Sequence, residues 1–433
     1  MTDSNPPAPA ASRRRDRRSL YATPRHSRHG GGSATAFIFK LIAAALAVVL
    51  VSGASIAVVR VWSLGTAINN NAIDISNPDD STPPQIGAIT GSFNILVVGV
   101  DNDEEQSEAF GERDATLNDV NILLHVSEDH TSATVVSLPR DLITAQPACT
   151  DPESGETSSA QRNVSLNTAF ARGGLTCVVS TVADLTDLEI DYAAQMSFNA
   201  VVQMTDAVGG VSVCLAEPIE DDYSGLDLPA GTNVISGQTA LAFLRTRHGV
   251  GDGSDLSRIS SQQVYMSALL RQLQSDETLT NFTRLYRLAN VAATNVRLST
   301  SLTSIDTMVS MAQSLSTVDL STMALVQYPG TTGDPDFPGK VMPDEDVAEE
   351  LFAAIAADEP ITLGEDSLGS GSVLDGSVPT EEPVATETPV APVATEAPTA
   401  TDGATPAPEP TSAAIEGLTG QTAAQQTCSA ASG

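Results

Sequence analysis

The stretch Phe93-Asn-Ile-Leu-Val-Val-Gly-Val100 begins the part of the chain whose pattern decides the fold class. Two further apolar runs, Val120-Asn-Ile-Leu-Leu-His-Val126 and Ala133-Thr-Val-Val-Ser-Leu138, follow it closely. Their β-branched composition and short length predict β-strands. Further strands are expected at 192–198 and 211–215, and helices at 178–185, 200–208, 237–246 and 256–273, with Ser236 and Ser254 as N-caps. This mixture predicts an α/β fold, a sheet with helices on both faces.

Charged residues follow two of these strands directly. Asp101 comes after the first strand, and Arg140 and Asp141 come after the third. Ligands of open α/β sheets bind outside the carboxyl ends of strands. Each residue alone could be a loop-capping charge, but together they are candidates for a binding site.

Three arginines, Arg245, Arg247 and Arg258, cluster in the stretch Leu244-Arg-Thr-Arg-His-Gly-Val-Gly-Asp-Gly-Ser-Asp-Leu-Ser-Arg258. Residues 41–433 hold only 13 Lys and Arg against 52 Asp and Glu, a net charge of −39. Because arginine's planar fork suits phosphate, the cluster predicts a site for a phosphate group. An ion-pair network with Asp252 and Asp255 is the alternative. The acidity of this region excludes nucleic acid as a partner.

Magnesium is the metal that this composition favours. Mg²⁺ binds one or two carboxylates together with substrate phosphate oxygens. The candidate carboxylates are Asp101, Asp103, Asp114, Asp119 and Asp141. The sequence contains no Walker motif, which excludes a P-loop nucleotidase. Arginines beside an aspartate-bound metal are typical of phosphoryl transfer.

The N-terminal region predicts a single-pass protein of the cell membrane. Residues 1–36 form a basic, disordered tail, and the uncharged run Leu41–Val59 predicts a transmembrane helix over 37–60. Eight basic residues precede the run, so the tail is expected in the cytoplasm and the rest outside. A cleaved signal peptide is the alternative. Residues 61–92 are expected to form an extracytoplasmic stalk.

The C-terminal region, 359–433, is rich in Pro, Thr, Ala and Glu and is predicted to be a disordered tail with a terminal cysteine segment. All four cysteines lie on the predicted outer side, where disulfides persist. Cys149 and Cys177 flank a loop-like stretch and are predicted to form a disulfide. Cys214 either pairs with Cys428 or is a buried free thiol.

Six sequence landmarks follow one another within residues 93–273. They begin at Leu96, Val136, Leu166, Asp206, Gly237 and Asp252 and include Val136-Ser-Leu-Pro-Arg-Asp141 and Asp252-Gly-Ser-Asp-Leu-Ser-Arg-Ile-Ser-Ser-Gln262. This series shows a resemblance to the LytR-CpsA-Psr family in its actinobacterial form. It implies a catalytic domain over 93–358 with a three-layer α/β/α sandwich, a mixed central sheet and an apolar tunnel for a polyprenyl lipid.

The family resemblance also implies a reaction. Such enzymes move a glycopolymer from a polyprenyl-pyrophosphate carrier to peptidoglycan and form a phosphodiester, and a polyprenyl pyrophosphatase activity is expected in vitro. By position, Asp101 and Asp119 would hold Mg²⁺, with Mn²⁺ as an alternative. Asp255 would orient an arginine or assist proton transfer. The residues implied to bind the pyrophosphate are Arg113, Arg140, Arg245, Arg247, Arg258 and Gln262, of which Arg140 and Arg247 are also expected to be catalytic.

Two positions differ from the family pattern. Leu117 stands where the family usually has an arginine, and Ser165 stands where many members have a lysine. These differences favour an alternative function, a non-catalytic protein that binds a polyprenyl phosphate or the cell wall.

Overall fold

The computed structural model describes residues 66, 72–75, 91–102, 115–151, 154–274, 282–303, 305–364, 366–376 and 413–433. The expected basic tail, the expected membrane helix and Arg113 lie outside these residues, as does most of the expected stalk. Within the described ranges, no helix combines the length and hydropathy that a membrane crossing requires. The following description concerns the unit formed by Val61–Gly433.

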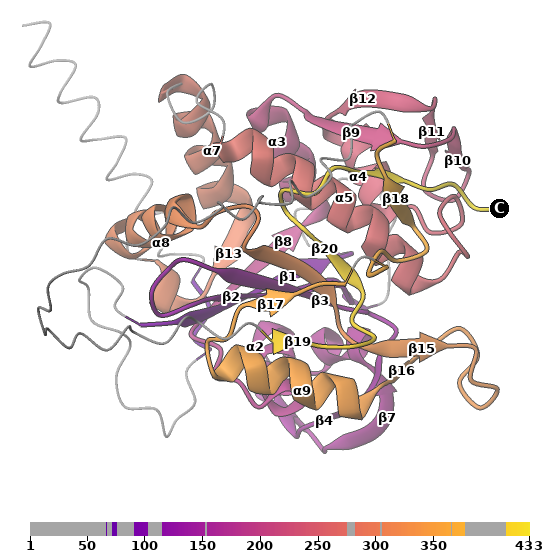
Figure 1. Ribbon diagram of the computed structural model, residues 1–433. Coiled ribbons are helices and arrows are strands. Elements are labelled where there is room, and N and C mark those ends of the chain that lie inside the picture. Colours follow the sequence, from indigo (N-terminus) through magenta and orange to yellow (C-terminus); the bar gives the residue numbers. More distant parts are fainter. Residues whose placement is uncertain are drawn as a thin grey trace, which may run out of the picture. The chain divides into compact units, whose positions relative to one another are not determined.

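A seven-stranded mixed sheet lies at the centre of this unit (Figure 1). β8 is parallel to β1 and β3 is parallel to β14, whereas the other neighbouring pairs are antiparallel. The strands that the sequence predicts over 93–100, 120–126 and 133–138 are confirmed, and they lie side by side in this sheet. In spatial order the strands are β13 (Val296–Leu298), β8 (Tyr192–Ser197), β1 (Phe93–Val100), β2 (Asn118–Val126), β3 (Ala133–Leu138), β14 (Met323–Gln327) and β20 (Gly420–Thr422).

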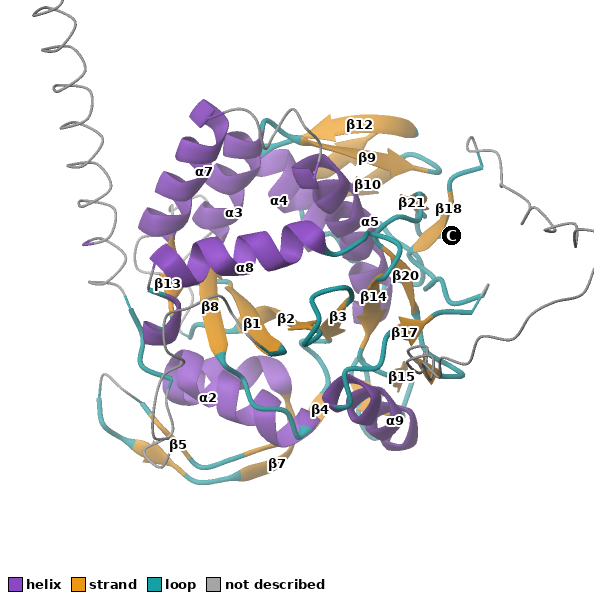
Figure 2. Cartoon of the chain, turned by 60° about the vertical axis from the view of Figure 1, so that its left-hand side comes forward, coloured by secondary structure: helices purple, strands orange, loops and turns teal. Residues whose placement is uncertain are grey.

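Helices cover both faces of this sheet, as Figures 1 and 2 show from two directions. On β1, Leu96 and Val98 pack into the apolar cluster of α2 and α9, whereas Phe93 and Ile95 pack into the cluster of α8. This alternation is what a strand buried on both faces requires. The first face carries α2 (Ala169–Thr186) and α9 (Glu345–Ala356), and the second carries α3 (Phe198–Val208), α4 (Gly237–Arg245), α5 (Asp255–Gln274), α7 (Phe282–Asn295) and α8 (Ile305–Thr317).

A smaller, four-stranded sheet packs against α5. Its interior joins Val213 and Leu215 to Phe243 and Tyr265. The predicted strand at 211–215 is therefore confirmed, but it belongs to this second sheet. In spatial order the strands are β12 (Gly231–Ile235), β9 (Val211–Leu215), β21 (Thr427–Ser429) and β18 (Ser372–Leu374).

Short strand pairs form the edges of the unit. They are β4 (Ile143–Gln146) with β7 (Gln161–Ser165), β5 (Cys149–Thr150) with β6 (Thr157–Ser158), β10 (Ile219–Asp221) with β11 (Leu226–Leu228), β15 (Gly330–Thr332) with β16 (Val341–Pro343), and β17 (Ile361–Thr362) with β19 (Ala413–Ala414). Two 3₁₀ turns, Leu166–Thr168 and Thr300–Leu302, connect other elements.

The expected end of the folded domain at residue 358 is too early. β17, β18, β20 and β21 all lie in the region that the sequence predicts to be a disordered tail, and β20 and β21 join the two main sheets. β20 and β21 are short and mostly polar, so they lack the apolar alternation that identifies a strand in a sequence. Main-chain hydrogen bonds to strand edges and the fully buried Gln421 hold them instead. Residues 377–412 lie outside the described residues.

Candidate functional site

Three strand ends meet at one edge of the large sheet. β1 ends at Val100, β2 begins at Asn118, and β3 ends at Leu138, and the antiparallel pairing of these strands places all three ends together. Asp101 is tied to the start of β2, because its main-chain N–H donates to Leu117 O over 3.1 Å and its Oδ1 accepts from Leu117 N over 2.8 Å.

A β-bulge sets the position of Asp119. Gly99 pairs with Val120 and Val100 pairs with Asn118, so Asp119 has no partner on β1. Bulges redirect side chains and are common beside functional sites. A Cβ on Gly99 would stand 3.0 Å from Cβ of Val120, so a side chain at this position would crowd the bulge.

Arg140 is the centre of the ion pairs at this edge. Its Nη1 lies 2.8 Å from Asp119 Oδ1, and its Nε lies 3.7 Å from Asp141 Oδ2 and 3.8 Å from Asp255 Oδ1. Burial disfavours its charge, but Asp119, Asp255 and Asp141 outweigh burial and raise the pKa of Arg140 above its ordinary value. The guanidinium is therefore fixed in its charged form.

The N-terminus of α5 contributes Asp255 and Arg258. Ser254 caps this helix, as predicted, since its Oγ accepts from Ser257 N over 3.2 Å. Arg258 Nη2 lies 2.7 Å from Asp255 Oδ1 and donates to Asp119 O over 3.0 Å. Both side chains are almost fully buried, and burial lowers the pKa of Arg258. The sequence left open an ion-pair network between the clustered arginines and Asp252 and Asp255. Of that network, the structure contains the pair of Arg258 with Asp255.

Asp141 joins Arg247 and Lys340. Arg247 Nη1 lies 3.4 Å from Asp141 Oδ2, and Lys340 Nζ lies 2.8 Å from Asp141 Oδ1. Burial alone would raise the pKa of Asp141, but the bond from Lys340 and the charges of Arg140 and Arg247 outweigh it and lower the pKa. Lys340 is absent from the sequence-based prediction. The sequence does mark this residue in one way, because Lys340 is the only lysine after Lys40.

Arg245 and Gln262 make other contacts. The guanidinium of Arg245 lies 4.5 Å from the centre of the Phe198 ring. Gln262 Nε2 donates to Leu244 O over 2.8 Å, at the end of α4. Neither contact involves the carboxylates around Arg140, so the phosphate-binding role of both residues stays a prediction. Ser236, the expected cap of α4, makes no side-chain capping bond.

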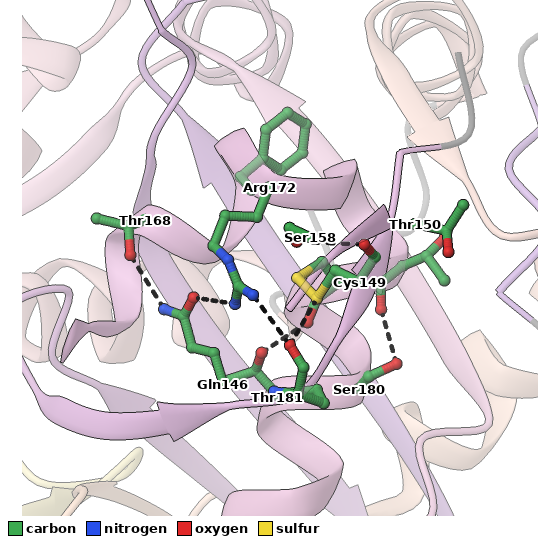
Figure 3. The surroundings of a disulfide bond; sticks show 12 residues. Gln146, Cys149, Thr150, Ser158, Thr168, Arg172, Ser180 and Thr181 are labelled. Carbon is green, nitrogen blue, oxygen red and sulfur yellow. Dashed lines mark hydrogen bonds between the residues drawn. A yellow bond between two sulfur atoms is a disulfide. The ribbon is translucent and has the colours of Figure 1, made fainter. Parts of the chain in front are cut away.

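The predicted disulfide between Cys149 and Cys177 is present, and its surroundings are shown in Figure 3. Arg172 braces the same loop by donating to Gln146 Oε1 over 2.7 Å and to Pro147 O over 3.1 Å. The pairing of Cys214 with Cys428, left open by the sequence, is present as well. It excludes the free-thiol alternative for Cys214.

Among the described residues, Arg140, Arg247, Arg258 and Lys340 form ion pairs with Asp119, Asp141 and Asp255, and Asp101 follows the adjacent strand end of β1. We call this set the charged cluster. Within the part of the chain that the structure describes, Nε of Arg140 and Nε of Arg258 are buried and have no acceptor at hydrogen-bond distance. A buried donor of this kind calls for an acceptor, which an ordered water, an ion or a ligand oxygen can supply.

Comparisons with known proteins find chains of similar sequence. Cell wall biosynthesis protein LcpA of Corynebacterium glutamicum is 32% identical over 238 residues, which is 48% of this chain and 45% of LcpA. The teichoic acid transferase TagT of Bacillus subtilis is 25% identical over 244 residues, 54% of this chain and 70% of TagT. The chain spans about half the length of LcpA and of LcpB from the same organism.

The fold has a solved counterpart in protein gbs0355 of Streptococcus agalactiae. The two share 22% identity with a TM-score of 0.50, over 62% of this chain and 88% of the other. The sequence model of one protein family matches residues 62–350, which is more than half of the chain. That range contains every residue of the charged cluster, and the chain belongs to the LytR_cpsA_psr family.

Proposed function

We propose that this chain is a membrane-anchored phosphotransferase that moves a glycopolymer from a polyprenyl-pyrophosphate carrier to peptidoglycan. The relative TagT is named a polyisoprenyl-teichoic acid–peptidoglycan teichoic acid transferase, and LcpA is named a cell wall biosynthesis protein. The anchor would be the apolar run Leu41–Val59, and the charged cluster would lie outside the cell. The lipid would occupy an apolar tunnel between the sheet and its helices.

The unpaired Nε groups of Arg140 and Arg258 are the observation that carries this proposal. A buried donor without an acceptor costs roughly 1–3 kcal/mol. Oxygens of a pyrophosphate would satisfy both donors and would also meet the partly exposed Arg247 and Lys340. Charge-assisted bonds of this kind are the strongest that proteins make to phosphate.

The donor chemistry at Asp101 and Asp119 fits magnesium. Both are buried carboxylates on neighbouring strand ends, and hard oxygen ligands are those that Mg²⁺ prefers. The cluster alone has equal numbers of positive and negative groups, so a pyrophosphate would bring uncompensated negative charge. A bound Mg²⁺ would supply the compensating charge and polarise the phosphoryl oxygens. Arg140 also holds Asp119, which keeps this carboxylate in place.

The residues of the cluster divide the work of the proposed transfer. Arg140, Arg247, Arg258 and Lys340 bind phosphoryl oxygens and stabilise the charge of the transition state. An acceptor hydroxyl attacks the phosphorus attached to the sugar, a new P–O bond forms, and the P–O bond to the lipid phosphate breaks. The hydroxyl proton passes to a carboxylate or to water, and lipid monophosphate leaves. Asp255 acts through Arg258 and Arg140, which it contacts.

Transfer by the full-length chain in lipid vesicles tests the proposal. The assay supplies a polyprenyl-pyrophosphate-linked oligosaccharide, Mg²⁺ and peptidoglycan, and it measures saccharide attached to the wall polymer and lipid phosphate released. Arg247→Ala should reduce transfer at least tenfold, since one charge-assisted contact to a phosphate contributes roughly 1.5–3 kcal/mol. Arg287→Ala, on the exposed side of α7, is the matched control and should transfer normally.

Two outcomes would contradict the proposal. Full transfer by Arg247→Ala would remove this arginine from the pyrophosphate site. Tight binding of the carrier by the wild-type chain without any lipid phosphate release would favour the non-catalytic alternative, to which Leu117 and Ser165 point. Arg258→Ala is a poorer probe, because it strands the buried carboxylate of Asp255 and should destabilise the fold by about 3–5 kcal/mol.

A further inference from the structure

Tyr223 is the one aromatic side chain among the large hydrophobic residues that the described part of the chain leaves exposed. Its side chain is 83% exposed, at the turn between β10 and β11. The base of this hairpin is anchored, since Ile219 and Leu226 are buried in the cluster beneath the small sheet. The ring of Tyr223 is therefore held toward solvent on a hairpin whose base is fixed.

A second exposed ring lies against it. The ring centres of Tyr223 and His248 are 4.4 Å apart, with the planes inclined by 33°. Gly249 permits this approach, because a Cβ there would stand 2.9 Å from Ile219 Cγ2 and 3.1 Å from Glu220 O. At this spacing the two rings stack on each other, so that each keeps one outer face, and we call this stacked pair the aromatic platform.

One buried carboxylate links the platform to the charged cluster. Asp221 Oδ1 accepts from Tyr223 N over 3.0 Å, and its Oδ2 accepts from Arg247 N over 3.2 Å and from Thr246 Oγ1 over 2.6 Å. His248 directly follows Arg247, which contacts Asp141. The turn that carries Tyr223 and the backbone of Arg247 thus share a single rigid anchor.

The charge around the platform restricts its ligand. Glu220 and Asp227 face each other across β10 and β11, Asp222 lies in the turn, and all three are exposed. This acidic rim repels a second phosphate or an anionic polymer. It does not repel an uncharged sugar, whose C–H bonds pack on an aromatic face and whose hydroxyls donate to carboxylates.

From this arrangement we propose that Tyr223 and His248 bind an uncharged pyranose ring beside the charged cluster. The inference rests on the proposed function in one respect, that the sugar belongs to a substrate of the transfer. The ring comes either from the glycopolymer attached to the carrier or from the glycan of peptidoglycan. Both sources present the same chemistry to the platform.

The first experiment measures binding without turnover. The full-length chain in lipid vesicles is titrated with an uncharged N-acetylglucosamine tetrasaccharide in the absence of carrier lipid. Tyr223→Ala should weaken binding roughly three- to tenfold, the range for one aromatic stacking contact, whereas Tyr223→Phe should bind like the wild type. Val234→Ala is the control, because Val234 is 72% exposed and lies on β12, outside the β10–β11 hairpin and the loop of His248. Unchanged tetrasaccharide binding by Tyr223→Ala would overturn the proposal that the aromatic platform binds a sugar.

The second experiment distinguishes the two sources. In the transfer assay, a higher KM of Tyr223→Ala for peptidoglycan alone assigns the ring to the acceptor, and a higher KM for the carrier-linked saccharide alone assigns it to the donor. In both cases kcat should stay near the wild-type value, since the phosphate contacts are untouched. Normal KM values for both substrates overturn the assignment to the transfer reaction. A wild-type chain that binds the tetrasaccharide through Tyr223 but transfers nothing contradicts the proposed function alone.

Discussion

The two disulfides serve different parts of the molecule. Cys149–Cys177 joins residues 28 positions apart and braces the loop between β4 and α2 at the surface (Figure 3). Cys214–Cys428 joins residues 214 positions apart and fixes β21 beside β9. The first bridge is local in the sequence, whereas the second holds a distant segment in the small sheet that packs against α5.

The distant segment reaches the loop of Arg247. Beyond β21 the chain lies along residues 249–251, where Gly251 N donates to Ala430 O over 3.2 Å and Ser432 N donates to Gly249 O over 3.0 Å. Ser429 Oγ also lies 2.8 Å from Ser261 Oγ on α5. These residues follow the range that the family model matches, 62–350. The comparison therefore indicates that one bridge supports a surface loop and the other supports the site.

Removing the long-range bridge should have the largest effect. In the chain-entropy model a closed loop of this length stabilises the fold by about 5 kcal/mol. The double variant Cys214→Ser with Cys428→Ser should lose about that much unfolding free energy in denaturant titrations. It should also lose transfer activity at temperatures where it stays folded. Without the bridge, β21 no longer holds Ala430 and Ser432 against the loop that follows Arg247. Wild-type activity in the folded variant would break the comparison.

Removing the local bridge should cost less and should spare the site. The same model gives about 3.5 kcal/mol for the double variant Cys149→Ser with Cys177→Ser. Arg172 still braces the loop through Gln146 and Pro147, which should limit the loss further. At a temperature where both are folded, kcat should equal that of the wild type. A larger loss of activity here than for the long-range bridge would reverse the assignment of roles.

The sequence predicts the parts of this arrangement that depend on local pattern. The strands before Asp101 and Arg140 are short apolar runs, and the loop between Cys149 and Cys177 is recognisable from its polar composition. The sequence does not reveal β20 and β21, because polar residues such as Gln421 enter the sheets through main-chain bonds rather than through an apolar pattern.

Tertiary contacts also decide the site residues that sequence reasoning missed or misplaced. Lys340 pairs with Asp141 across 199 positions, a distance at which spacing in the sequence carries no signal. Gln262 lies one helical turn after Arg258 on α5, but its amide donates to Leu244 O instead of facing the charged cluster. The spacing of the two residues in the sequence does not reveal this partner.

The C-terminal contact can be tested without touching either bridge. Ser432→Pro removes the N–H that donates to Gly249 O, and the loss of one main-chain bond should cost roughly 1 kcal/mol. We expect transfer to fall several-fold while the melting temperature changes little. Gly433→Pro is the matched control, since a Cβ there meets no atom within 4 Å.

A second variant shows whether this contact acts through Arg247. If it does, Ser432→Pro should have little further effect on transfer in an Arg247→Ala background. Equal effects in both backgrounds would mean that the C-terminal residues support the fold in general and not this arginine.

Lys340 should show the smallest effect, because it reaches the cluster from the β15–β16 hairpin with no disulfide and is about one third exposed. The pKa of Asp141 is lowered, so the stability from its ion pairs is present above the ordinary carboxylate pKa and is lost as pH falls through the lowered value. Lys340→Met should bring the pKa of Asp141 closer to its ordinary value. Because solvent screens this pair, the unfolding free energy at neutral pH should fall by less than about 1 kcal/mol. The difference from the wild type should shrink as Asp141 becomes protonated in acid. Denaturant titrations across pH measure it, and a difference that persists undiminished in acid would show that Lys340 stabilises the hairpin by packing and not by its charge.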